Sequence, residues 1–255
     1  MPPFASYPSL KDRAVFVSGG GSGIGASIVE HFAGQGAKVG FVDIDEAAAK
    51  ALAARIAAAG HPAPLFAKCD VREIAAYQGA IADMASRLGP FTVLINNAAR
   101  DDRHSIEEVT PAFWDERISV NLRHQYFAIQ AVLPGMKKAG GGSIVNFSSV
   151  SYHAMTPKLS VYQAAKAAVI GMTRGLARDL GPDRIRLNSI TPGWIMTQRQ
   201  IDLWLTPEAE ADLMRAQCLK EKLYPPDIAR MALWLAADDS RLVTAQNFVV
   251  DGGRV

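Results

Sequence analysis

The chain has 255 residues, of which 49% are hydrophobic and 20% are charged, as in an ordinary globular protein. Its formal net charge of +2, without long runs of like charge, argues against binding to nucleic acid or to an anionic membrane. Two cysteines, Cys69 and Cys218, provide neither a disulfide framework nor a CxxC motif, and we expect no metal site. No apolar run approaches the ~20 residues of a membrane span. Residues 1–11 lack the apolar segment of a signal peptide, so we expect a cytoplasmic protein.

Short apolar segments alternate with longer helical patterns along the chain. The expected strands are residues 14–17, 38–42, 64–67, 91–95, 142–147, 184–190 and 247–250. The expected helices are residues 24–35, 46–59, 74–88, 161–180 and one that opens at Thr110-Pro111. Nearly continuous apolar strands separated by helices predict an α/β fold, a doubly wound parallel sheet in one Rossmann-like domain over residues 1–255. Residues 191–226, rich in Pro, Trp and Thr, interrupt this alternation and are expected to form a substrate loop.

A glycine-rich segment, Ser18–Gly25, stands between the first expected strand and the first expected helix. Glycines allow a tight turn and the close approach of a pyrophosphate, whose charge the helix N-terminus stabilises. A flexible turn would have the same composition, but the position between a strand and a helix favours a dinucleotide site.

Asp43 ends the second expected strand, 18 residues after Gly25. A carboxylate at this position accepts hydrogen bonds from the adenosine ribose and would repel a 2′-phosphate. No Lys or Arg lies in the glycine segment or directly after Asp43, so the sequence favours NAD over NADP. The alternative is a solvated acid at a strand end.

Tyr162 and Lys166 are four residues apart in an expected helix and share one face of it. A free tyrosine has a pKa of ~10, and a neighbouring lysine cation would lower the pKa of Tyr162 toward that of a useful general base. A solvated Tyr–Lys pair is the alternative. Ser149 follows the strand 142–147, and the carboxyl ends of strands are where open α/β sheets place their chemistry.

From Leu10 onward the chain resembles the short-chain dehydrogenase/reductase family. The motifs that carry this resemblance occur in order: Ser18-Gly19-x-x-x-Gly23-Ile24-Gly25, Cys69-Asp70-Val71, Asn96-Asn97-Ala98-Ala99, Asn121, Ser149, Tyr162-x-x-x-Lys166 and Pro192-Gly193. Ser18 stands where the family usually has Thr, and Ala99 where it usually has Gly; neither change removes a chemical group.

The resemblance implies catalytic roles for four residues. Tyr162 would be the acid/base and Ser149 would orient the substrate. Lys166 would hold the nicotinamide ribose and lower the pKa of Tyr162, and Asn121 would anchor a proton-relay water. The implied cofactor contacts are Gly19, Ser22, Gly23, Ile24, Gly25, Asp43, Ile44, Asp70, Val71, Asn97, Ala98, Ala99, Tyr162, Lys166, Pro192, Gly193, Ile195 and Thr197.

The loops expected around the site are rich in hydrogen-bonding and aromatic side chains, a combination that suits a sugar. We expect substrate contacts from Ser149, Ser151, His153, Tyr162, Trp194 and Arg199. Asp102, Arg103 and Trp204 lie in the same loops. The alternative to a substrate contact is a surface ion pair for Asp102 and Arg103, and packing in the lid for Trp204. Segments 101–104, 114–117, 121–124, 205–208 and 216–220 resemble bacterial NAD-dependent aldose 1-dehydrogenases of the D-xylose type, although they are less diagnostic than the catalytic motifs.

That second resemblance implies NAD-dependent oxidation of the anomeric C1 hydroxyl of an aldopyranose (D-xylose, L-arabinose, D-galactose or L-fucose) to a lactone. A 2-keto-3-deoxy sugar acid or a polyol is the first alternative, and Arg103 and Arg199 would then bind a carboxylate. An inert NAD-binding regulator is a second alternative, against which the complete Tyr, Lys and Ser set argues. The family resemblance also implies a homotetramer, with helix 161–180 at one interface and the strand near Phe248 at another.

Overall fold

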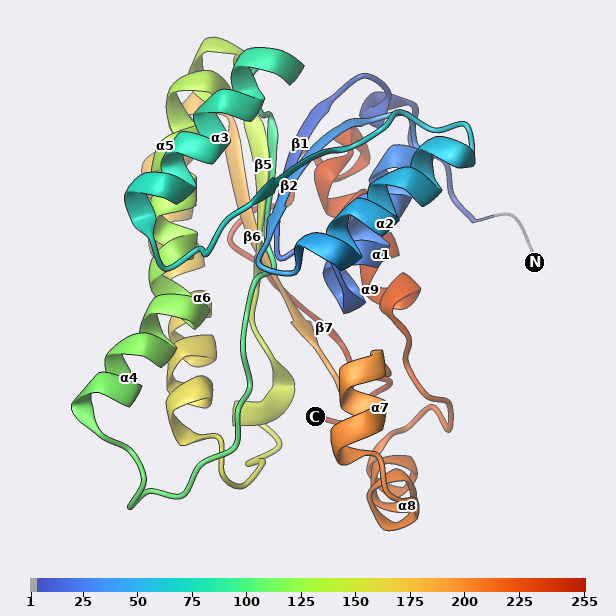
Figure 1. The fold of residues 1–255 in the computed structure, drawn as a ribbon, viewed down its shortest axis with the longest axis vertical. Coiled ribbons are helices and arrows are strands. Elements are labelled where there is room, and N and C mark those ends of the chain that lie inside the picture. The colour runs from blue at the N-terminus through green and yellow to red at the C-terminus, as the bar shows by residue number, and fades with distance from the viewer. Residues whose placement is uncertain (1–3) are drawn as a thin grey trace.

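The computed structural model describes residues 4–255, so the first three residues of the expected 1–255 domain lie outside the described residues. The chain forms a seven-stranded parallel sheet in the order β3-β2-β1-β4-β5-β6-β7 (Figure 1). The strands are β1 (Ala14–Ser18), β2 (Lys38–Asp43), β3 (Leu65–Lys68), β4 (Val93–Asn96), β5 (Gly142–Phe147), β6 (Ile185–Pro192) and β7 (Asn247–Val250). The predicted α/β fold with a doubly wound parallel sheet is confirmed.

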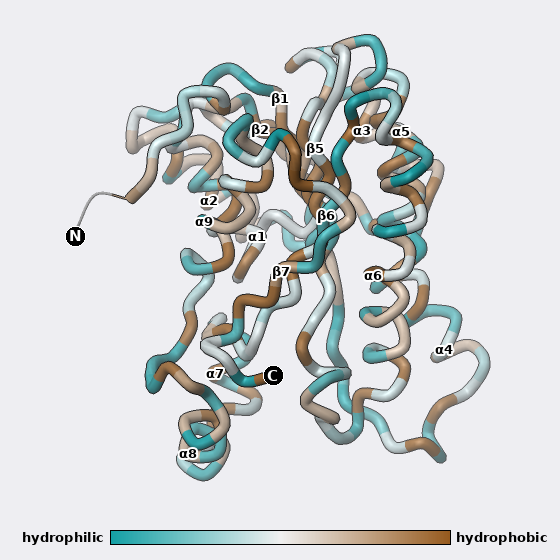
Figure 2. The backbone as a smooth tube through the Cα atoms, turned by 180° about the vertical axis from the view of Figure 1, so that it is seen from behind, coloured by the Kyte–Doolittle hydropathy of each residue, from teal (hydrophilic) through white to brown (hydrophobic). Residues whose placement is uncertain are grey.

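Helices cover both faces of the sheet. In Figure 1, α1 (Gly23–Gly34), α2 (Glu46–Ala58) and α9 (Pro225–Ala236) lie on one side. The other side carries α3 (Ile74–Leu88), α4 (Pro111–Ile118), α5 (His124–Lys138) and α6 (Ser160–Leu180). Because both faces are covered, the middle strands are buried throughout, and Figure 2 shows hydrophobic residues concentrated along them.

The sheet changes direction between β1 and β4, which are hydrogen-bonded neighbours although two strands separate them in the chain. From β1 the chain winds outward through β2 to β3, and then returns to β4 on the other side of β1. At such a switch point the loops that follow the two strands diverge and leave a crevice at their carboxyl ends. The glycine-rich segment and the Asn97–Ala99 segment face each other there.

Side-chain caps fix several helix starts. The Thr110 hydroxyl accepts a hydrogen bond from the amide of Phe113 at 3.1 Å, as the Thr-Pro pattern predicted. Thr197 caps α7 (Gln198–Trp204) and Thr206 caps α8 (Pro207–Ala216) in the same way. The segment expected as a loop, residues 191–226, therefore carries two helices, which lie beyond the carboxyl ends of β6 and β7 in Figure 1.

A π-helical turn, Ser119–Arg123, joins α4 to α5 and was not expected from the sequence. Such turns insert an extra residue into a helix and often occur at functional sites. This one carries Asn121, which is completely buried. Across residues 4–255, no helix is both long and apolar enough to cross a membrane. The same residues contain no group of three His, Cys, Asp or Glu side chains suited to a metal ion.

Candidate active site

A cavity of about 920 Å³ opens at the carboxyl ends of the strands. Its walls come from the loops after β1, β2, β4, β5 and β6, and from α7 and α8. All the expected cofactor residues line it: Gly19, Ser22, Gly23, Ile24, Gly25, Asp43, Ile44, Asp70, Val71, Asn97, Ala98, Ala99, Tyr162, Lys166, Pro192, Gly193, Ile195 and Thr197. The fold thus gathers into one cavity residues that span most of the chain.

The glycine segment is packed so closely that side chains would not fit. Gly19 has a φ of +66°, and a Cβ on it would lie 2.9 Å from the Cα of Ala98. A Cβ on Gly25 would lie 1.8 Å from the carbonyl oxygen of Gly19. The first turn of α1 therefore sits directly against the loop after β1, with bare backbone facing the cavity. This arrangement fits the pyrophosphate of a dinucleotide at the helix N-terminus.

Ser18 and Asn97 hold the two cavity loops together. The Ser18 hydroxyl accepts hydrogen bonds from the amides of Asn97 and Ala98, both at 3.1 Å. The side-chain amide of Asn97 donates to the carbonyl oxygens of Ser18 at 3.1 Å and Gly19 at 2.9 Å. Asn97 thus stabilises the glycine turn through its side chain. Because the hydroxyl at position 18 makes these hydrogen bonds and the methyl group of a threonine makes none, Ser can replace Thr there.

The carboxylate of Asp43 is fixed by two backbone amides. It accepts from the amide of Gly21 at 2.7 Å and from that of Asp45 at 2.9 Å. These bonds orient it at the end of β2, beside the glycine turn, where the ribose of an adenosine would lie. Asp70 is occupied differently: its carboxylate pairs with Arg72 at 2.5 Å, and this hydrogen-bonded pairing lowers the pKa of Asp70.

Lys166 is buried in α6 and reaches the end of β5. Its Nζ atom donates to the backbone carbonyl of Phe147 at 2.9 Å and lies 5.6 Å from the ring centroid of Tyr162. Burial lowers the pKa of Lys166 to about 7, against the opposing attraction of Asp101. The ammonium retains further donors that could bind ribose hydroxyls.

The expected lowering of the Tyr162 pKa is wrong for the protein alone. Burial, followed by the negative charge of Asp101, raises the pKa of Tyr162 above 10, while Ser149 and Arg103 oppose that rise. Desolvation disfavours the phenolate, and Lys166 is not among the groups that lower the pKa of Tyr162. Tyr162 is therefore a neutral hydroxyl in the cofactor-free protein, which is the state of a general acid.

Asn121 is placed behind the cavity wall and does not line it. Its side-chain oxygen accepts from the amide of Arg100 at 2.9 Å, and its side-chain nitrogen donates to the carbonyl of Arg100 at 3.0 Å. A third bond joins the nitrogen to the carbonyl of Arg117 at 3.0 Å. The side chain thus holds the segment after β4, and the backbone carbonyl of Asn121 accepts from the side-chain nitrogen of Gln125 at 3.4 Å.

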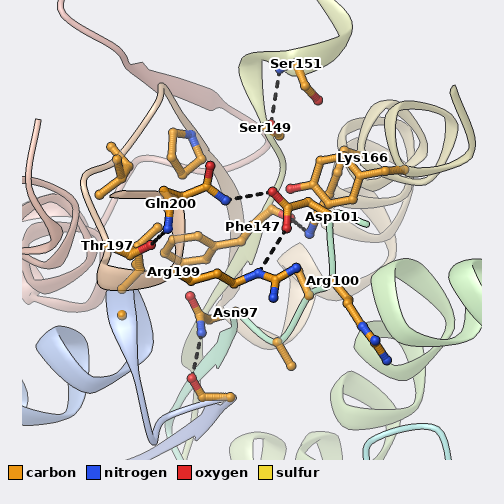
Figure 3. A pocket seen from close by; sticks show the side chains of 18 of the residues that line it. Asn97, Arg100, Asp101, Phe147, Ser149, Ser151, Lys166, Thr197, Arg199 and Gln200 are labelled. Carbon is orange, nitrogen blue, oxygen red and sulfur yellow. Dashed lines mark hydrogen bonds and ion pairs between the residues drawn. The ribbon is translucent and has the colours of Figure 1, made fainter. Parts of the chain in front are cut away.

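The substrate end of the cavity is closed by contacts between α7 and the segment after β4 (Figure 3). The indole of Trp194 donates to the side-chain oxygen of Gln200 at 2.9 Å, and the Gln200 amide donates to Asp101 at 2.8 Å. Arg199 pairs with Asp102 at 3.0 Å. Gln200 was not expected as a site residue, because its two partners are distant in sequence from each other.

One expected substrate residue lies elsewhere. His153 is exposed and is not among the described residues that line the cavity. The short 3₁₀ turn Val150–Tyr152 reverses the chain after Ser149, and the His153 ring lies against Tyr152, with 4.1 Å between centroids. The other expected contacts, Ser149, Ser151, Tyr162, Trp194 and Arg199, all line the cavity. The structure adds Phe147, Gln200, Leu213 and Arg254 to its walls.

The ion pair between Asp102 and Arg103, the alternative to a substrate role for these residues, is not formed. Asp102 pairs instead with Arg100 at 2.7 Å and Arg117 at 2.8 Å, in addition to Arg199. The Arg103 guanidinium lies 4.8 Å above the ring of Trp204. Trp204 therefore packs on a cation at the cavity wall.

The fold and the cavity define an oxidoreductase of the dinucleotide-binding type, and comparison with known proteins specifies the family. A family model described as enoyl-(acyl carrier protein) reductase matches residues 19–254. The chain is 50% identical to a probable galactose dehydrogenase of Rhizobium meliloti (strain 1021), with 98% of each chain covered. It is 48% identical, again over 98% of each, to a D-xylose 1-dehydrogenase of Caulobacter vibrioides.

Solved structures are also similar to this chain over nearly its whole length. A 3-oxoacyl-[acyl-carrier protein] reductase from Brucella melitensis with bound NAD has a TM-score of 0.88 and 32% identity, covering 99% of this chain and 97% of that one. A blue fluorescent protein from a metagenomic library in complex with NADPH has a TM-score of 0.88 and 34% identity, covering 97% and 99%. The chain belongs to the short-chain dehydrogenase/reductase family, as predicted, and its cofactor is a nicotinamide dinucleotide.

Proposed function

We propose that this protein is an NAD-dependent sugar dehydrogenase, which oxidises the anomeric C1 hydroxyl of an aldopyranose to the lactone. D-xylose, L-arabinose, D-galactose and L-fucose are the candidate substrates. The observation that carries this proposal is the composition of the cavity around Tyr162, where hydrogen-bonding side chains and the ring of Trp204 line one wall. The similarity of the chain to a probable galactose dehydrogenase and to a D-xylose 1-dehydrogenase supports it.

In the oxidation that we propose, Tyr162 takes the proton of the hydroxyl being oxidised, and the Ser149 hydroxyl donates a hydrogen bond to the same oxygen. Bound NAD⁺ supplies the hydride acceptor for C1 and a positive charge that favours the phenolate of Tyr162. Lys166 is placed by Phe147 so that its remaining donors face the cavity. Asn121 positions the segment after β4, and a relay water would share its backbone carbonyl with the side chain of Gln125.

NAD is favoured over NADP because the Asp43 carboxylate is fixed by the amides of Gly21 and Asp45. Its charge would repel a 2′-phosphate at short range, and it cannot turn away without losing both bonds. Arg72, a basic residue of the cavity lining, is already paired with Asp70 and Glu116. A dinucleotide with free ribose hydroxyls is therefore the better fit.

The sugar-acid alternative is not favoured, because Arg199, one of the two arginines proposed to bind its carboxylate, is already paired, and the other, Arg103, lines the cavity together with the negatively charged Asp101. Arg199 lies 3.0 Å from Asp102 and 3.5 Å from Asp101. Binding an acid there would require breaking these pairs. The inert-regulator alternative is not favoured either, since Ser149, Tyr162 and Lys166 line one cavity.

We also propose that the protein works as a homotetramer in the cytoplasm. Gly171 and Gly175 lie on the outer face of α6, and within residues 4–255 no atom lies within 4 Å of a Cβ built on either. Val249 of β7 is 42% exposed beside Phe248. Light scattering coupled to gel filtration tests this assembly, and a monomer at micromolar concentration would contradict it.

The substrate screen is the direct test of function. NADH formation is measured with the four aldoses, with 2-keto-3-deoxy sugar acids and with polyols, and then repeated with NADP. We expect the highest kcat/KM for an aldose with NAD. A tenfold preference for a sugar acid or a polyol, or for NADP, would contradict the corresponding part of the proposal.

A further inference from the structure

The segment that follows β4 lines the cavity with most of its residues, Asn97 to Asp101 and Arg103. Asp101 and Arg103 line it, whereas Asp102 between them is not among the described lining residues. Asp102 is directed to Arg100, Arg117 and Arg199. Two residues of opposite charge thus face the cavity from one short stretch of chain, and the residue between them anchors that stretch.

Asp101 retains capacity to accept hydrogen bonds. Its Oδ2 atom accepts from Gln200 at 2.8 Å, while its Oδ1 atom lies 3.5 Å from the Nε of Arg199, too far for a strong bond. A carboxylate has about four lone-pair sites, so at least two remain open to a ligand. The contact with Gln200 fixes the orientation of the carboxylate, as Figure 3 shows.

Arg103 retains capacity to donate. One of its nitrogens donates to the carbonyl of Pro157 at 3.3 Å. Its Nε is buried and has no hydrogen-bond partner among the described residues. The guanidinium carbon lies over the Trp204 ring, 4.8 Å from its centroid. Most of its five N–H donors are therefore available to a ligand, and a buried donor without a partner is costly unless a ligand or water satisfies it.

Both charges act at the catalytic tyrosine. Asp101 raises the pKa of Tyr162, and Arg103 lowers it. Both side chains line the same cavity as Tyr162, in which the oxidised hydroxyl must lie.

We propose that Asp101 and Arg103 bind the ring hydroxyls next to the carbon that is oxidised, and so select a polyhydroxylated substrate. A sugar hydroxyl is at once a donor and an acceptor, so a fixed carboxylate and a fixed guanidinium bind two neighbouring hydroxyls in complementary ways. The ring of Trp204, with the Arg103 guanidinium over one face, lines the same cavity and offers its remaining apolar surface to the ring carbons. This assignment rests on the proposed function and names the residues that would give it its specificity.

The test compares two substrates with the same reacting group. D-xylose carries ring hydroxyls beside its anomeric hydroxyl, whereas tetrahydropyran-2-ol has the anomeric hydroxyl alone. For Asp101→Asn and Arg103→Leu, we expect kcat/KM to fall at least tenfold more with D-xylose than with tetrahydropyran-2-ol, mainly through KM. Asp102→Asn is the matched control, because it removes a neighbouring charge that does not face the cavity. For this control variant, the loss of kcat/KM with D-xylose should agree within threefold with the loss with tetrahydropyran-2-ol.

A pH profile gives a second readout that a merely structural role would not produce. Removing the negative charge of Asp101 should shift the rising limb of kcat/KM to lower pH, and removing the positive charge of Arg103 should shift it to higher pH. Shifts in the same direction would overturn the assignment. Asp101→Ser and Arg103→Gln, which also remove the charges, replace any variant whose melting temperature shows that it does not fold.

The outcomes separate this inference from the proposed function. A wild-type enzyme that oxidises tetrahydropyran-2-ol but no aldose would overturn both. A wild type that oxidises aldoses, with variants that lose the two substrates equally or not at all, would overturn the roles of Asp101 and Arg103 alone.

Discussion

The Nζ atom of Lys166 lies 2.9 Å from the backbone carbonyl of Phe147, so the helix that carries Tyr162 is joined to the end of β5 by a buried cation. Only 1% of Lys166 is exposed. A single bond to a carbonyl does not replace the hydration of an ammonium, which is why burial lowers the pKa of this lysine to about 7. The active site thus holds a charge whose presence depends on pH near neutrality.

Stability should depend on pH through Lys166. An unfolded lysine keeps its proton to about pH 10.4, whereas folded Lys166 loses it near pH 7. Between these values the unfolded chain binds more protons, so the free energy of unfolding rises with pH. Relative to Lys166→Met, the cofactor-free wild type should gain up to about 1.4 kcal/mol per pH unit above pH 7. Urea unfolding of both proteins at pH 7, 8 and 9, at one protein concentration, measures this; a difference that does not change with pH would contradict it.

Removing the hydroxyl of Tyr162 should abolish proton transfer. We expect Tyr162→Phe to lower kcat by about 10²- to 10⁴-fold, the usual contribution of a positioned acid or base. The Kd for NAD should change little, because the ring remains. Tyr152→Phe is the control, since Tyr152 is not among the described residues that line the cavity. Steady-state rates with the best aldose and calorimetric NAD titration provide the measurements, and an active Tyr162→Phe enzyme would refute the mechanism.

Cofactor choice should depend on the charge at position 43. Asp43→Asn keeps an oxygen for the amide of Gly21 but loses the charge that would repel a 2′-phosphate. The ratio of kcat/KM for NADP to that for NAD should rise at least tenfold. Glu30→Gln makes the same change in net charge outside the cavity, on α1, and should leave the ratio where it is. Equal ratios in the two variants would show that Asp43 does not select the cofactor.

The glycine turn permits a matched pair of substitutions in one helix. A Cβ at Gly25 would overlap the carbonyl oxygen of Gly19 at 1.8 Å, so Gly25→Ala must push α1 away from the loop. We expect it to cost about 2–3 kcal/mol of stability and to weaken NAD binding. At Gly34 no described atom lies within 4 Å of a new Cβ, and Gly34→Ala should be neutral or stabilise by up to about 1 kcal/mol. Thermal unfolding measures the stability of the two variants. Similar changes in stability for Gly25→Ala and Gly34→Ala would show that the close contact between Gly25 and Gly19 does not limit the side chain at position 25.

Local sequence signals predicted the regular elements well. The helix expected at 74–88 has those bounds, because an apolar stripe and the following Gly89-Pro90 mark it. Helices α7 and α8 were missed, although Thr206-Pro207 is the same start signal as Thr110-Pro111. The π-helical turn at Ser119–Arg123 had no local signal, since it depends on the bonds that Asn121 makes to Arg100 and Arg117.

The site was predictable where its chemistry is carried by motifs, and less so where it depends on contacts between loops. Spacing could place Tyr162 and Lys166 on one face of a helix, but it could not show that burial would raise the pKa of the tyrosine. It also could not show that the turn after Ser149 would leave His153 outside the cavity. Desolvation and chain direction are set by the surrounding elements.

The sequence by itself determined the strand–helix alternation, the bare backbone of the glycine turn and the identity of the reacting groups. These properties follow from hydrophobic periodicity, from the absence of a side chain and from the chemistry of single residues, all of which are local. The tertiary structure decided which charges remain free. It joins Arg199 to Asp102, 97 positions away, and turns Asp101 and Arg103 to the cavity that Tyr162 lines. Only packing between distant segments can assign such partners, because the strength of a charge pair depends on distance and burial in three dimensions.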